Sequence, residues 1–138
     1  MPLTFTYTEG ALPETAEKQI VAKLTESMLR WHGLASNTVM TPTVTAQVHV
    51  ISKGRGFTGG QESSGAWVEW KTPSFAFATR EIQIGHIKEA TNIVHEASGG
   101  NLTKNQIWVN VVHAVDGAWG IGGIAMTNAE LAEAISKG

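Results

Sequence analysis

The sequence predicts an α/β (α+β) domain in which two β-α-β units form a four-stranded mixed sheet with two helices on one face. Two observations support this class: apolar residues alternate in four short segments, and two longer segments between them repeat at helical spacing. A third is that a glycine-rich stretch closes each unit. The order strand, helix, strand therefore occurs twice, which indicates an internal duplication within a single domain of residues 1–138.

The first unit covers about residues 2–60. Apolar residues alternate with threonines in residues 3–8, as expected for a strand with two different faces. A helix is expected between Pro13, which suits a first helical position, and Gly33, which suits a helix end. Residues 44–51 alternate again, and the connection is long enough for a right-handed crossover. We therefore expect the two strands to be parallel.

The second unit is assigned to about residues 74–126. The segment SFAFAT at 74–79 predicts its first strand, IWVNVV at 107–112 its second, and residues 84–98 the helix between them. Residues 61–73 are interpreted as the linker between the units. The buried face of the second helix is expected to carry Ile84, Ile87, Thr91, Val94 and Ser98, widened by Ala90, Ile93 and Ala97.

The glycine-rich stretches are GRGFTGG at 54–60 and GAWGIGG at 117–123. The first contains the G-x-G-x-x-G spacing of dinucleotide sites, but such a site must open a helix, and the residues that follow have no helical periodicity. We interpret it as a glycine turn or hairpin. A short C-terminal helix is expected within 127–138.

Composition excludes several classes of function. The chain carries 10 Lys+Arg and 12 Asp+Glu, a formal charge of −2, and no basic run, so nucleic-acid binding is not expected. No apolar stretch approaches the ~20 residues that span a bilayer, and the first residues do not resemble a signal peptide, so we expect a cytoplasmic protein with no membrane partner. There is no cysteine, and we expect no cofactor.

Histidines and tryptophans offer no clear metal or ligand motif. No two of the five histidines have the spacing of a common metal-ligand pair, so each is interpreted as solvated or hydrogen-bonded. Four tryptophans are interpreted as core or subunit-contact residues rather than as ligand platforms: Trp31, Trp67, Trp70 and Trp108.

Pro2 directly follows the initiator methionine and opens the first strand. Methionine before a small residue is normally removed, which would leave a secondary amine held at a strand end and able to accept or donate a proton. The alternative is that proline at a strand start only avoids a missing ladder donor. The duplication of the β-α-β unit favours the catalytic interpretation.

These features together resemble the tautomerase superfamily. The Met-Pro start, the Glu9-Gly10 turn and the Gly-Ile-Gly-Gly at 120–123 are similar to 4-oxalocrotonate tautomerase-like units. Two units in one chain resemble the fused branch with malonate semialdehyde decarboxylase and cis-3-chloroacrylic acid dehalogenase. The resemblance implies a tautomerase/MIF-like fold, catalysis without a cofactor, a small carboxylate substrate and a homotrimer.

The resemblance also implies roles for particular residues. Pro2 matches the catalytic proline, and Arg80 matches an arginine that binds the substrate carboxylate. Trp119 keeps an apolar ring beside the amine. Gln83 and Asn110 stand where fused dehalogenases carry a second arginine and a water-activating tyrosine, so we expect them to line the substrate site without those roles.

The leading expectation is keto–enol tautomerisation of a small 2-oxo acid, with Pro2 as general base and acid. A desolvated amine near Trp119 and the positive Arg80 should have a pKa lowered toward neutrality. One alternative is a decarboxylase or hydratase-dehalogenase, for which Asp116 would have to point inward. Another is a trimeric ligand-binding protein without catalysis, which retention of Met1 would favour.

Overall fold

The computed structural model describes all 138 residues and contains a mixed four-stranded sheet with the strand order β2-β1-β5-β6. β1 and β2 are parallel, β5 and β6 are parallel, and the two pairs meet through the antiparallel β1 and β5. The strands are β1 Leu3–Thr8, β2 Ala46–Ile51, β5 Ala66–Pro73 and β6 Ile107–Ala114. The predicted fold class and the parallel pairing of the first unit are confirmed.

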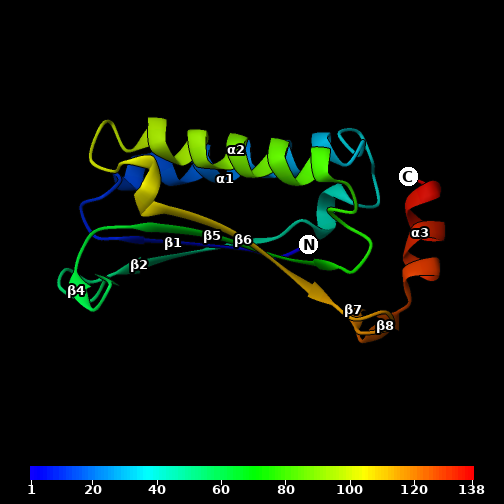
Figure 1. The fold of residues 1–138 in the computed structure, drawn as a ribbon. Coiled ribbons are helices and arrows are strands. Elements are labelled where there is room, and N and C mark those ends of the chain that lie inside the picture. The colour runs from blue at the N-terminus through cyan, green and yellow to red at the C-terminus, as the bar shows by residue number, and fades with distance from the viewer.

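Two long helices cover one face of this sheet, α1 Glu17–Trp31 and α2 Arg80–Ala97 (Figure 1). A shorter helix, α3 Asn128–Ser136, follows the last hairpin, and its Thr127 cap and Glu130 bond each other's backbone N–H groups. This confirms the expected C-terminal helix. No helix in the chain combines the length and the hydrophobicity needed to cross a membrane. Short 3-10 helices occupy Glu14–Ala16, Thr41–Thr43 and Lys104–Gln106.

The first strand of the second unit was wrongly predicted. It is β5, Ala66–Pro73, within the segment interpreted as a linker, whereas residues 74–79 form a turn in which Phe77 has a φ of 56°. The reason is visible in the burial of β5, because Ala66, Val68 and Trp70 are fully buried on one face. Arg80 is therefore the first residue of α2 and not the end of a strand.

The hydrophobic core lies between the helices and the sheet. β1 contributes Leu3, Phe5 and Tyr7, all at most 1% exposed, and these were the residues expected to share one face. The expected face of α2 is partly wrong, because Ile84 and Ile87 are exposed. The buried residues of α2 are instead His86, Ala90 and Val94.

Each unit ends in a β-hairpin that has a two-residue turn. β3 Phe57–Thr58 pairs with β4 Gln61–Glu62, and β7 Trp119–Ile121 pairs with β8 Ile124–Met126. The turns are Gly59-Gly60 and Gly122-Gly123, and all four glycines have positive φ, as a type I′ turn requires. The glycine-turn interpretation of 54–60 is confirmed. The two hairpins lie at opposite ends of the sheet (Figure 1).

The sheet face away from the helices is not covered by any element of the chain (Figure 1). We call it the open face, and alternation along the strands assigns to it Thr4, Thr6, Gln47, His49, Trp67, Glu69, Lys71, Trp108, Asn110 and Val112. Trp67 and Trp108 are register partners on neighbouring strands, and Trp108 is 50% exposed. The two tryptophans therefore form a short apolar strip on a face whose other residues, apart from Val112, are polar.

Candidate active site

The start of β1 places Pro2 directly opposite Lys71 of β5. The backbone N–H of Lys71 donates to the carbonyl oxygen of Pro2 at 2.9 Å, one step beyond the Leu3–Trp70 pair. Opposed residues of antiparallel strands project to the same face with Cβ atoms about 5 Å apart. Because Leu3 and Trp70 point into the core, Pro2 and Lys71 lie together on the other side of the sheet.

Pro2 and Lys71 line a cavity of about 470 Å³. One part of its wall is the chain start with the turn before β2, which contributes Met1, Thr43 and Thr45. The other part comes from the end of β6 and from β7. Lys71 is the only charged residue that lines the cavity. The pocket is therefore mainly apolar, with one cation at its edge.

Trp119, the first residue of β7, brings an indole ring to this cavity. Only 8% of the residue is exposed, and its Nε1–H has no hydrogen-bond partner within the chain. A buried donor left unpaired destabilises a protein by about 1–3 kcal/mol. The structure thus brings Trp119 and Pro2 to one cavity, while the indole Nε1–H itself is buried without an acceptor.

Met1 is buried at the same place, with 2% of its surface exposed. Its amino group donates to the carbonyl oxygen of Thr43 at 2.6 Å. Burial lowers the pKa of this amino group to about 5, because the charged ammonium form loses hydration there. The surroundings of the chain start therefore favour a neutral amine.

The other site residues expected from the sequence lie outside this cavity. Arg80 is exposed at the first turn of α2, and its Nη1 donates to Oε1 of Gln83 at 3.3 Å. Gln83 donates in turn to the carbonyl oxygen of Phe77 at 2.9 Å. Asn110 is exposed in the middle of β6, opposite Glu69. The chain brings Arg80 and Gln83 together, but it does not bring them to Pro2.

Asp116 does not line the cavity, and the structure contains no cluster of metal-binding side chains. The Asp116 carboxylate accepts the backbone N–H of Asn128 at 2.7 Å, at the start of α3. It does not line the cavity. No group of three or more His, Asp or Glu side chains is placed to hold a metal ion.

Lys71, Thr43 and Thr45 are cavity residues that the sequence analysis missed. Lys71 lies in the segment 61–73, which the sequence analysis interprets as a linker and which the structure shows to contain β5. The signal was present, since apolar and other residues alternate through AWVEWK at 66–71, which is a strand pattern. Thr43 and Thr45 belong to a loop, and their place beside Pro2 depends on the crossover from α1.

The internal repeat supplies only one such site per chain. The pairing of Leu3 with Ala46 in the first unit corresponds to that of Ala66 with Ile107 in the second. Gly65 is therefore the counterpart of Pro2. Gly65 lies inside the chain, so its nitrogen is an amide and has no basic lone pair.

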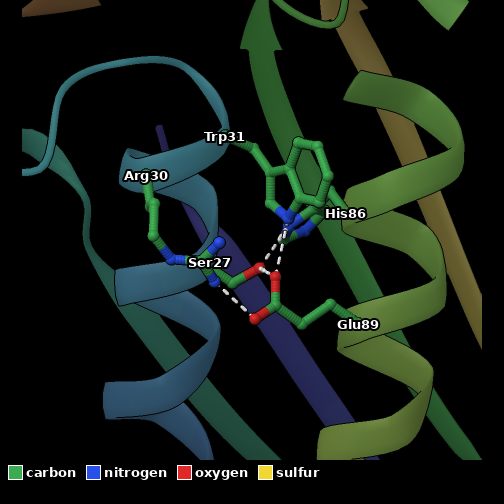
Figure 2. A network of polar contacts seen from close by, with 5 residues as sticks. All are labelled: Ser27, Arg30, Trp31, His86 and Glu89. Carbon is green, nitrogen blue, oxygen red and sulfur yellow. Dashed lines mark hydrogen bonds and ion pairs between the residues drawn. The ribbon is translucent and has the colours of Figure 1, made fainter. Parts of the chain in front are cut away.

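A second polar cluster joins α1 to α2 away from the cavity. Figure 2 shows Ser27, Arg30 and Trp31 of α1 converging on Glu89 of α2. Ser27 Oγ donates to Glu89 at 2.7 Å, Trp31 Nε1 donates at 2.6 Å, and Arg30 forms an ion pair with the same carboxylate. Partial burial by itself raises the pKa of Glu89, but these hydrogen bonds outweigh it and hold the pKa below its usual value.

His86 completes this cluster, and its geometry excludes a serine nucleophile. Its Nδ1 lies 3.0 Å from Ser27 Oγ (Figure 2). Ser27 has one proton and donates it to Glu89, so Nδ1 of His86 carries the proton that Ser27 accepts. His86 Nε2 has no partner, and the ring packs against Trp70 and Phe77. The histidine does not act as a base toward Ser27, and both residues are buried.

Comparison with solved structures identifies chains that share this architecture. No family model and no curated protein matches the sequence. The chain is similar to the solved structure of Pt0534 inactivated by 2-oxo-3-pentynoate, with a TM-score of 0.76, 17% identity, and 95% and 98% of the two chains covered. These values show a shared fold rather than a shared activity.

Two other solved structures show the same likeness. The Q0 fused 4-OT, described as a symmetric trimer, has a TM-score of 0.75 with 14% identity, covering 95% of this chain and 98% of that one. N1, a member of the cis-3-chloroacrylic acid dehalogenase family, has a TM-score of 0.74 with 14% identity, covering 96% and 90%. These neighbours are 4-OT-like members of the tautomerase superfamily, and the chain has their fold.

Proposed function

We propose that this chain is a cofactor-independent tautomerase of small 2-oxo acids, in which the Pro2 nitrogen, freed by removal of Met1, is the general base and acid. The observation that carries the proposal is the position of Pro2 in a mainly apolar cavity, beside the Trp119 ring and opposite the Lys71 cation. The superfamily fold is consistent with this chemistry.

The direction of each proton transfer depends on whether the Pro2 nitrogen is neutral or protonated. The neutral Pro2 nitrogen removes a proton from C3 of the 2-oxo acid, and the protonated nitrogen then gives this proton to the C2 oxygen of the enolate, which yields the enol and restores the neutral amine. In the reverse direction the protonated nitrogen returns a proton to C3. The Lys71 side chain opposite Pro2 disfavours a second positive charge at this nitrogen, which supports a Pro2 amine that is neutral near pH 7.

We further propose that the working form is a homotrimer assembled through the open face. A single chain leaves the paired Trp67 and Trp108 facing outward. Apolar side chains gathered on an uncovered sheet favour association. The Q0 fused 4-OT, which shares the fold, is described as a symmetric trimer.

One observation favours a non-catalytic ligand-binding protein as a second candidate. Met1 is almost fully buried, and its amino group is hydrogen-bonded to Thr43. A chain that keeps Met1 has an amide nitrogen at Pro2, which is not a base at neutral pH. Intact-mass measurement of the purified protein separates the two functions, because the tautomerase must lack one methionine.

The decisive kinetic test is Pro2→Ala with phenylpyruvate as substrate. We expect the enolisation rate to fall about 100-fold, since the rigid secondary amine is lost. Pro13→Ala is the matched control, because Pro13 is exposed at the start of a helix and lines no part of the cavity. An unchanged rate in Pro2→Ala contradicts the proposal.

The pH profile distinguishes the tautomerase from the lyase alternative. Only the neutral amine accepts a proton, so kcat/KM for phenylpyruvate should rise with pH through the pKa of Pro2 and then level off. A decarboxylase or dehalogenase that uses protonated Pro2 as an acid should lose activity over the same range. Parallel assays with malonate semialdehyde and 3-haloacrylates identify which chemistry the protein performs.

A further inference from the structure

We propose that Asn37 is a positioning residue for the Pro2 cavity, and that it acts by holding the helix α3 against the loop between α1 and β2. We call the helix held in this way the strap, because it connects the two parts of the cavity wall. The effect on catalysis rests on the proposed function, whereas the strap itself can be tested without a substrate.

The two parts of the cavity wall come from segments that are far apart in the sequence. The loop between α1 and β2 supplies Thr43 and Thr45, and β7 supplies Trp119–Ile121. The loop also holds the chain start, because the carbonyl oxygen of Thr45 accepts the backbone N–H of Leu3 at 2.8 Å. The position of this loop relative to β7 therefore sets where a substrate lies with respect to the Pro2 nitrogen.

α3 begins beside one part of the wall and ends beside the other. It follows β8, the hairpin partner of β7, and runs back toward the loop between α1 and β2 (Figure 1). At its first turn the backbone N–H of Asn128 donates to Asp116 at 2.7 Å, in the turn before β7. Leu131 is 2% exposed, and Ile135 also packs against the core. The helix is therefore a packed part of the molecule at both of its ends.

Asn37 connects the last turn of α3 to the cavity loop. Its Nδ2 donates to the carbonyl oxygen of Ile135 at 2.9 Å. Its Oδ1 accepts the backbone N–H groups of Val39 and Met40 at 3.0 and 2.8 Å, in the turn that leads into Thr41–Thr43. Only this orientation of the amide matches two donors and one acceptor. One side chain therefore uses its donor on the strap and its acceptor on the loop that lines the cavity.

Two substitutions separate these contributions. Asn37→Asp keeps an oxygen that accepts the two backbone N–H groups of the turn, but it removes the donor to α3 and places a carboxylate at the C-terminus of that helix, where it is unfavourable. Asn37→Ala removes both contributions. Asn101→Ala is the matched control, because Asn101 Nδ2 also donates to a backbone carbonyl, that of Gly10 at 3.5 Å, beyond the opposite end of β1.

Hydrogen exchange followed by mass spectrometry tests the strap. In Asn37→Asp we expect amide exchange about tenfold faster across 117–136, which contains the β7–β8 hairpin and α3, while the turn at 38–43 keeps its protection. In Asn37→Ala both segments should exchange faster, and in Asn101→Ala neither should. The strap is overturned if Asn37→Asp leaves exchange across 117–136 unchanged, or if Asn101→Ala changes it equally.

Enolisation of phenylpyruvate tests whether the strap positions the substrate. A small displacement of a bound substrate lowers the rate steeply, so we expect kcat/KM to fall about tenfold in Asn37→Asp and Asn37→Ala, with KM raised about threefold. A partly unfolded sample lowers kcat in proportion to its folded fraction and leaves KM unchanged, so the rise in KM identifies a positioning role. Wild-type kcat and KM in an Asn37→Asp variant whose α3 exchanges faster overturn that role.

Failure of the proposed function gives a different result. If wild-type protein lacking Met1 does not enolise phenylpyruvate, but Asn37→Asp alone speeds exchange across 117–136, the tautomerase proposal fails together with the effect on catalysis, and the strap stands. If Pro2→Ala abolishes enolisation while Asn37→Asp has wild-type exchange and kinetics, the tautomerase proposal stands and the strap is overturned.

Discussion

At the residue scale, His86 is a titratable side chain with no access to water. Burial, with smaller contributions from the nearby His32 and Arg30, lowers the pKa of His86 to about 4, and Glu89 partly opposes this shift. In the unfolded chain the imidazole titrates near pH 6.5. The unfolded state therefore takes up a proton between pH 6.5 and 4 that the folded state does not. The free energy of unfolding should decrease over this interval by at most about 3 kcal/mol, and should not depend on His86 above it.

Urea denaturation of wild-type and His86→Asn at pH 7.5 and pH 4.5 measures this contribution. We expect the difference in unfolding free energy between the two pH values to be smaller in the variant, because asparagine does not titrate. His49→Asn, on the exposed β2, should keep the wild-type dependence. Equal dependence in wild-type and His86→Asn would show that other groups account for the loss of stability in acid.

At the scale of elements, the packing of α1 on α2 depends on a glycine inside a helix. A Cβ atom at Gly85 would lie 2.1 Å from the ring of Trp31. Helix propensity alone predicts that Gly85→Ala stabilises α2 by about 1 kcal/mol. The indole is held by its hydrogen bond to Glu89, so the methyl group must displace it. We expect a net destabilisation of about 1–3 kcal/mol.

A double-mutant cycle with Trp31→Ala isolates this contact. In the Trp31→Ala background the space above Gly85 is open, and Gly85→Ala should become neutral or stabilising, as measured by thermal or urea unfolding. A stabilising Gly85→Ala in the wild-type background would mean that the indole moves without loss, and that its bond to Glu89 contributes little to the pairing of the helices.

At the scale of the whole molecule, we expect the chains to associate into a trimer through the open face. Trp108→Glu places a carboxylate in the strip with Trp67, where its desolvation in an interface is unfavourable. We expect a trimer, about 44 kDa from three chains of 14.7 kDa, to dissociate in this variant, as judged by light scattering on a sizing column. Ile84→Glu makes the same kind of change on exposed α2 and should leave the mass unchanged. A wild-type monomer, or a trimeric Trp108→Glu, contradicts assembly through the open face.

Local pattern was enough to predict most of the elements. Alternation identified β1, and the glycine pairs at 59–60 and 122–123 predicted turns that need positive φ. The same reasoning failed at 74–79, where SFAFAT alternates like a strand but follows the real strand, β5. Two adjacent segments with the same period compete for one place in a sheet. The segment that pairs in the sheet is β5, because its apolar face, which includes Trp70, fills the core.

The order of elements, the duplication and the presence of Pro2 at the chain start were determined by the sequence alone, because they depend on neighbouring residues and their spacing. Only the tertiary structure decided which side chains share the cavity with Pro2. Lys71 reaches it through antiparallel pairing of β5 with β1, and Trp119 through the hairpin after β6. These residues are far apart along the chain, and the pairing of distant segments, which no local pattern encodes, brings them together.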